Sequence, residues 1–157
     1  MTYLTLKSLH ILSAFLLFGT GLGSAFYKYM TDRSGNVAAI AHTNRLVVLA
    51  DWLFTTPTVI FQPVSGVVLA NILHIPLTTP WIASAIVLYI LAGLCWLPVV
   101  VLQIKMRDLA AFAVRENQPL PAIYYRYARI WFWLGVPAFL AMVVVVFLMV
   151  FHQVFWS

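Results

Sequence analysis

The sequence predicts an all-α integral membrane protein, a single four-helix transmembrane bundle that occupies residues 1–157. Of these 157 residues, 64% are apolar or aromatic, and the mean hydropathy is +0.98. The chain holds only nine basic and four acidic residues, whereas about a quarter of the residues in a soluble domain are charged. The apolar residues suffice for four spans of about 20 to 25 residues each. A water-soluble fold is therefore excluded, and we expect no extramembrane domain.

Turn-forming clusters divide the chain into helices at about residues 4–29, 44–73, 80–113 and 124–155. The first helix ends where Asp, Ser, Gly and Asn gather in residues 31–36. The second ends before Pro76, because proline lacks an N–H and restricts the residue before it. Pro80 opens the third helix, where the missing N–H does no harm. The polar and proline residues of 115–121 then separate the third helix from the fourth.

The positions of the basic residues predict the orientation in the membrane. The turns after the first and third helices carry eight of them, namely Lys28, Arg33, Arg45, Lys105, Arg107, Arg115, Arg126 and Arg129. Only Lys7 lies on the other side. Short cytoplasmic loops are enriched in lysine and arginine. We therefore expect a multi-pass protein of the bacterial inner (cytoplasmic) membrane, with both termini in the periplasm.

Other features of the composition narrow the function further. The single cysteine, Cys95, excludes an intramolecular disulfide and any site built from four cysteines. The first apolar stretch is too long for a signal peptide and lacks a cleavage pattern, so we expect a retained helix. No basic surface interleaved with aromatic residues supports nucleic acid as a partner. The six tryptophans lie largely toward the span ends, which is typical of aromatic belts.

Three polar residues predict a structural polar cluster near the cytoplasmic ends of the second and third helices. Asp51 lies a turn or two inside the second helix, and Gln103 and Arg107 lie at comparable depth on the third. Unpaired polar groups are costly in hydrocarbon. An ion-pair cluster that ties the two helices together explains these residues, and a proton path or a lipid head-group site is the alternative.

His10 is the candidate ligand of a cofactor. It lies roughly 10 Å below the outer boundary of the membrane, on a face that also carries small residues such as Ser13. Counting depth along each helix brings Met149 and His152 of the last helix near its level. Because imidazole is a common ligand of haem iron and other metals, these residues predict His/Met or His/His ligation. The alternative is a histidine hydrogen-bonded to a hydroxyl or carbonyl of another helix.

Gln62 is a second candidate for the cofactor site, since it lies at a similar depth on the second helix. Pro57 and Pro63 on the same helix predict a bend. Gln62 adjoins Pro63, so its side chain is also placed to satisfy a backbone group that the proline frees.

Glycines at positions 19, 21 and 23 form a GTGLG run in the first helix. Small residues with this spacing favour close packing of membrane helices. A cofactor that lies flat against Gly21 and its neighbours is the alternative interpretation.

The order of residues also resembles a bacterial family of predicted integral membrane proteins of unknown function. The resemblance extends to the superfamily of HemJ-type protoporphyrinogen oxidases and the CopD copper-resistance membrane domain. The segments that carry the resemblance are YLTLKSLHILSAFLLFGTGLGSAFY, ADWLFTTPTVIFQPVSGVVLA, LTTPWI and CWLPVVVLQIKMRDLA.

HemJ-like proteins are four-helix membrane proteins that bind b-type haem through the histidine of the LKxLHI opening. The resemblance therefore implies haem b as the cofactor and His10 as an axial ligand. Near the start of the third helix, where HemJ-like proteins show a polar His-x-Lys pattern, this chain has Trp81, Ile82, Ala83 and Ser84. That difference argues against protoporphyrinogen oxidation.

Together these observations predict an inner-membrane haem protein for electron transfer or for oxidation of a lipophilic substrate. Besides the lipid bilayer, its expected partners are quinol or porphyrin, and a second copy or a larger respiratory complex. One alternative is a cofactor-free structural or assembly subunit of a respiratory membrane complex. Another is copper or metal homeostasis, with the outward cluster of His10, His74, His152 and Met149 as ligands.

The glycine run generates a test of self-association. If copies of the chain pack through the GTGLG face, the double substitution Gly19→Leu plus Gly23→Leu will prevent close approach of the helices and reduce the oligomer to monomers. Light scattering of detergent-solubilised protein, corrected for bound detergent, measures the mass. An unchanged oligomeric mass in the double variant would refute this role of the glycines.

Overall fold

The computed structural model describes the backbone of residues 2–155 and the side chains of residues 3–151. Its elements are α1 (Thr2–Ser34), α2 (Val37–Ala50), the π-helical segment η1 (Asp51–Thr55), α3 (Thr56–Ile72), α4 (Pro80–Arg115) and α5 (Ala122–Phe155). Within these residues, four stretches are long and apolar enough to cross a membrane: Tyr3–Ser34, Val37–Ile72, Pro80–Arg115 and Ala122–Phe151. The all-α, four-span fold that the sequence predicts is thus confirmed.

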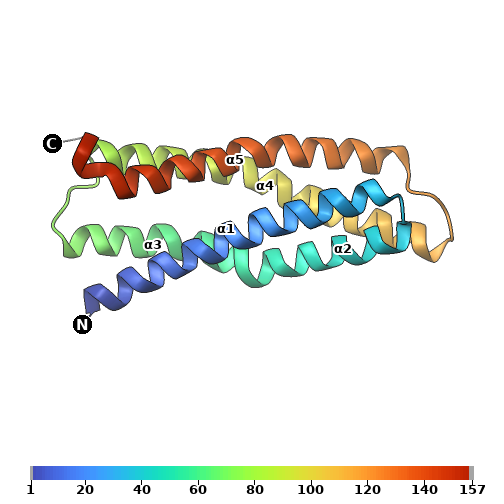
Figure 1. The fold of residues 1–157 in the computed structure, drawn as a ribbon, viewed down its shortest axis with the longest axis horizontal. Helices are drawn as coiled ribbons and strands as arrows, with labels where there is room; N and C mark the ends of the chain where they lie inside the picture. The colour runs from blue at the N-terminus through green and yellow to red at the C-terminus, as the bar shows by residue number, and fades with distance from the viewer. Residues whose placement is uncertain (1, 156–157) are drawn as a thin grey trace.

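The helices run along the longest axis of the molecule (Figure 1). α1 packs against α2, η1 and α3, while α4 packs against α2 and α5. Both ends of the described chain lie at the same end of the bundle as the α3–α4 turn, and the other two turns lie at the opposite end (Figure 1). This is the arrangement of four passes across one bilayer. Which end faces the cytoplasm stays a prediction of the charge pattern.

The turn between the first two spans is shorter than the sequence suggests. α1 continues to Ser34 instead of ending near residue 29, and α2 begins at Val37 instead of near residue 44. Gly35 has a φ of +68°, which glycine adopts readily. The Asn36 side chain then caps α2, because its Oδ1 accepts the Ala39 N–H at 3.1 Å. These two residues are sufficient to reverse the chain.

The second span contains a widened turn ahead of its first proline. In η1 the Thr56 N–H donates to the Asp51 carbonyl, five residues earlier in the chain. Pro57 follows directly and has no N–H to continue the normal helical pattern. The bend that the prolines predict stays a prediction, and the structure shows a π-helical turn ahead of Pro57, an element that is frequent at functional sites.

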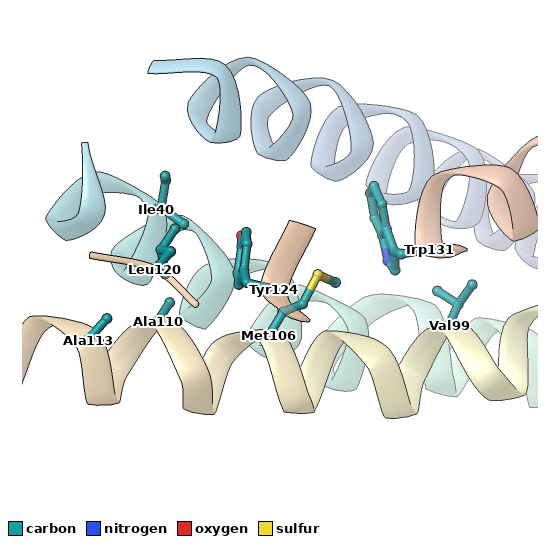
Figure 2. Close-up of a cluster of buried hydrophobic side chains, with 8 residues drawn as sticks. All are labelled: Ile40, Val99, Met106, Ala110, Ala113, Leu120, Tyr124 and Trp131. Carbon is teal, nitrogen blue, oxygen red and sulfur yellow. The ribbon is translucent and has the colours of Figure 1, made fainter. Parts of the chain in front are cut away.

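The hydrophobic core lies toward the end of the bundle that holds the α4–α5 turn. It is formed by Ile40, Val99, Met106, Ala110, Ala113, Leu120, Tyr124 and Trp131. Figure 2 shows Ala110 and Ala113 of α4 beneath Leu120 and Ile40, where small side chains leave room for the larger ones. The core thus joins α2, α4 and α5.

A buried polar network adjoins this core and adds α1 to it. Lys28 is 0% exposed, and its ammonium donates to Asp32 Oδ2 at 2.7 Å and to the Tyr124 hydroxyl at 2.9 Å. The Tyr124 hydroxyl donates to Asp32 Oδ1 at 2.6 Å and accepts from Asn44 Nδ2 at 2.7 Å. The Lys28 Nζ also lies 5.5 Å from the centroid of the Trp131 ring. One tyrosine hydroxyl therefore connects α1, α2 and α5.

The network predicts a large effect of removing that hydroxyl. Tyr124→Phe would leave Lys28, Asp32 and Asn44 each without one partner, which we expect to lower the free energy of unfolding by about 1–3 kcal/mol. Thermal unfolding in detergent measures the loss. Tyr125→Phe is the matched control, because Tyr125 is 49% exposed. Equal stability of the two variants would show that the network does not hold the helices together.

Candidate functional site

His10 lies at the interface between α1 and α3, and its ring is held by a hydroxyl of the neighbouring helix. The His10 Nδ1 is 2.7 Å from the Ser65 Oγ. The ring lies against the backbone at Gly66, where an added Cβ would come within 3.6 Å of the His10 Cε1. The hydrogen bond that the sequence left as the alternative to ligation is therefore present.

The partners of Ser65 indicate which ring nitrogen carries the proton. Its hydroxyl lies 2.7 Å from the Phe61 carbonyl and 3.2 Å from the Gln62 carbonyl of its own helix. A hydroxyl has one proton to donate, and a carbonyl can only accept, so the 2.7 Å contact with Phe61 is a hydrogen bond only when Ser65 donates that proton to it. Ser65 then accepts the Nδ1–H of His10, which leaves the lone pair on Nε2. In the described part of the chain, no hydrogen bond occupies that nitrogen.

Gln62 is brought to His10 as expected, but it contacts the backbone and not the ring. Its Nε2 donates to the His10 carbonyl at 2.8 Å and to the Ser13 Oγ at 2.6 Å. It does not cap the carbonyl that Pro63 frees. That carbonyl belongs to Val59, and it accepts the Tyr89 hydroxyl of α4 at 2.6 Å. A residue of another span therefore takes the role that the sequence suggested for Gln62.

The expected second ligands lie on α5. Met149 is 40% exposed, and the side chain of His152 lies outside the described residues. His74 lies in the α3–α4 turn with a φ of 55°. Among the residues that the structure describes, no three His, Cys, Asp or Glu side chains come together to hold a metal ion. Ligation by Met149 or His152 stays a prediction.

A cavity of about 350 Å³ lies among the four spans. Glycines from three helices line it: Gly21 of α1, Gly93 of α4 and Gly135 of α5. A Cβ added at any of them would meet no atom within 4 Å. The same holds for Gly19 and Gly23. Within the described residues, the GTGLG run therefore does not pack closely against another helix, and Gly21 borders open space instead.

Two members of the expected polar cluster share this cavity, and the third does not. Asp51 and Gln103 are 8% and 6% exposed, and both line the cavity. The Arg107 side chain is 37% exposed and forms an ion pair with Asp108 at 2.8 Å. The adjacent Asp108 offers a carboxylate that stays hydrated, whereas pairing with Asp51 would require burying the guanidinium. The cluster of three is therefore not formed.

The sequence did not predict that two tryptophans, Trp96 and Trp131, also line the cavity. Their Nε1 atoms are buried and have no hydrogen-bond partner among the described residues. A position near a span end does not distinguish a tryptophan of the aromatic belt from one that points inward. The sequence signal for the inward position was the nearby glycine, since Gly93 and Gly135 lie within one turn of these residues on their helices.

The spans and the cavity among them define a multi-pass integral membrane protein with a polar group of side chains inside the bundle. Residues 4–153 match the family described as "Predicted integral membrane protein (DUF2269)", and the chain belongs to this family. No curated protein and no solved structure matches the chain.

Proposed function

We propose that this membrane protein binds b-type haem with His10 as an axial ligand, for electron transfer or oxidation of a lipophilic substrate. The observation that supports it is the 2.7 Å hydrogen bond between His10 Nδ1 and Ser65. In this proposal the chain lies in the bacterial inner membrane with His10 toward the periplasmic side, as the basic turns predict. Haem, when bound, supplies one-electron redox chemistry at its iron.

The residues around His10 have the properties that an axial ligand needs. Histidines that bind metals usually donate their other ring N–H to an oxygen acceptor, which fixes the tautomer and the ring orientation. Ser65 is such an acceptor for Nδ1–H, and Nε2 keeps the lone pair. Gln62 and Ser13 both donate to the His10 carbonyl, at 2.8 Å and 3.0 Å. These bonds hold the backbone that carries the imidazole.

One observation favours a second candidate, a cofactor-free structural or assembly subunit. The polar side chains of His10, Ser13, Gln62 and Ser65 already satisfy one another between α1 and α3. A group of this kind stabilises two packed helices without any ligand. The two candidates differ in whether Nε2 has a function.

Optical spectra test the haem proposal. Protein purified in detergent after expression with haem supply is expected to show a Soret band that shifts on reduction with dithionite. His10→Ala should abolish this band, and Ser65→Ala should weaken haem affinity about tenfold or more, because the ring loses its orienting partner. His42→Ala is the matched control, since His42 lies on the exposed side of α2.

Each outcome has a clear meaning. An unchanged spectrum in His10→Ala would eliminate His10 as the ligand. A folded, colourless wild-type protein whose thermal stability falls on His10→Ala substitution would overturn the haem proposal and support the structural subunit.

A further inference from the structure

The cavity among the spans is distinct from the surroundings of His10. Its lining on α1 begins at Leu17, seven residues beyond His10 in the chain. At 1.5 Å per helical residue this separation is about 10 Å along α1. His10 and Ser65 do not line the cavity. A ligand of the cavity therefore has to be inferred from the residues that line it, separately from any group bound at His10.

An unpaired hydrogen-bond donor is the feature of the cavity that calls for a ligand. Trp131 is 8% exposed, and its buried Nε1–H has no acceptor among the described residues. Figure 2 shows the indole between α5 and α4, with its nitrogen at the end nearest Val99, another lining residue. Lys28 covers the ring at 5.5 Å from its centroid. Because the membrane interior offers no water to the nitrogen, an acceptor is missing at this point.

Trp96 of α4 also lines the cavity, and its Nε1 is buried. The Asp51 carboxylate, however, is within reach of the Trp96 N–H as a hydrogen-bond acceptor, so Trp131 is the donor that needs an acceptor from outside the chain. Gln103 and Thr55 also border the cavity. These polar groups contrast with walls that are otherwise almost entirely apolar. The cavity therefore suits a molecule that is mostly apolar and carries a hydrogen-bond acceptor for Trp131.

The cavity also has access to the lipid. Leu22 of α1 and Leu140 of α5 both line it and are 58% and 56% exposed. α1 packs on α2, η1 and α3, and α5 packs on α4. Phe18 of α1 and Phe139 of α5 contact each other at the cavity, with ring centroids 5.7 Å apart, so the exposed Leu22 and Leu140 mark where the cavity opens to the lateral surface of the bundle. At Gly21, Gly93 and Gly135 the wall carries no side chain, which leaves room there for a flat ring.

We propose that this cavity binds a flat lipophilic ring carbonyl compound of the quinone class, one of whose carbonyl oxygens accepts a hydrogen bond from the indole N–H of Trp131. The ring lies against the glycines, and the alkyl tail extends between α1 and α5 into the bilayer. This binding site is independent of haem at His10. It identifies the lipophilic substrate of the proposed function as a quinone and places it in this cavity.

Binding of a radiolabelled decyl-benzoquinone to the protein in phospholipid nanodiscs tests this proposal, with empty nanodiscs subtracted. Saturable binding is expected for the wild type. Trp131→Phe keeps an aromatic ring but removes the N–H, and should weaken binding about tenfold, as the loss of one hydrogen bond does. Trp133→Phe is the matched control because Trp133 is 65% exposed, and it should bind as the wild type does.

A second pair of variants tests whether the quinone occupies the open space of the cavity, and leaves the Trp131 N–H unchanged. Gly135→Leu places a side chain into the cavity and should abolish binding, whereas Gly19→Leu adds the same side chain at an exposed glycine outside the cavity and should not. The decyl-dimethoxybenzene analogue, which has ether oxygens in place of the carbonyls, should compete poorly. His10→Ala should bind the quinone normally, which separates this result from the outcome for haem.

Three results would overturn the proposal. The first is an absence of saturable binding to the folded wild-type protein. The second is equal affinity of Trp131→Phe and Trp133→Phe. The third is a tightly held phospholipid that the quinone does not displace, which would identify the cavity as a lipid site.

Discussion

The absence of water inside a bilayer is the constraint on which the contacts between the spans depend. Each backbone or side-chain polar group must find its partner within the protein. Pro63 removes an N–H from α3, and the Tyr89 hydroxyl of α4 takes the free Val59 carbonyl at 2.6 Å. Gln62 donates across to the His10 carbonyl of α1. The prolines and polar residues of the second span thus create the bonds that join it to its neighbours.

The same constraint separates the molecule into two parts with different character. At the end with the α4–α5 turn, Lys28 has acceptors from two other residues, and a core of small and large side chains surrounds Tyr124. Toward the middle of the bundle, glycines replace side chains, and Trp131 keeps an unpaired N–H. The packed end fixes the helices relative to one another. Open space farther along the bundle is therefore compatible with a stable fold.

The sequence predicted the fold because long apolar runs have one solution in lipid, and it placed Asp51, Gln103 and Gln62 inside the bundle correctly. It did not predict the partners of these residues, since a partner depends on how each helix is rotated about its axis. Lys28 illustrates the limit: a lysine near a span end usually extends to the interface, yet here it is 0% exposed. Its acceptor Tyr124 lies 96 residues away in the chain, and no local pattern connects the two.

The difference between satisfied and unsatisfied polar groups also decides which site needs a ligand. The His10 ring already has Ser65, so its environment is stable with or without a bound group, and only the free Nε2 argues for one. Trp131 has no such partner, and in hydrocarbon an unpaired N–H costs more than in a protein that water can enter. A sequence retains such a donor without penalty when an acceptor from outside the chain occupies the cavity. The proposed quinone site is therefore inferred from the Trp131 N–H, which lacks an acceptor, whereas the proposed haem site is inferred from the free lone pair of His10 Nε2. The two proposals are independent of each other.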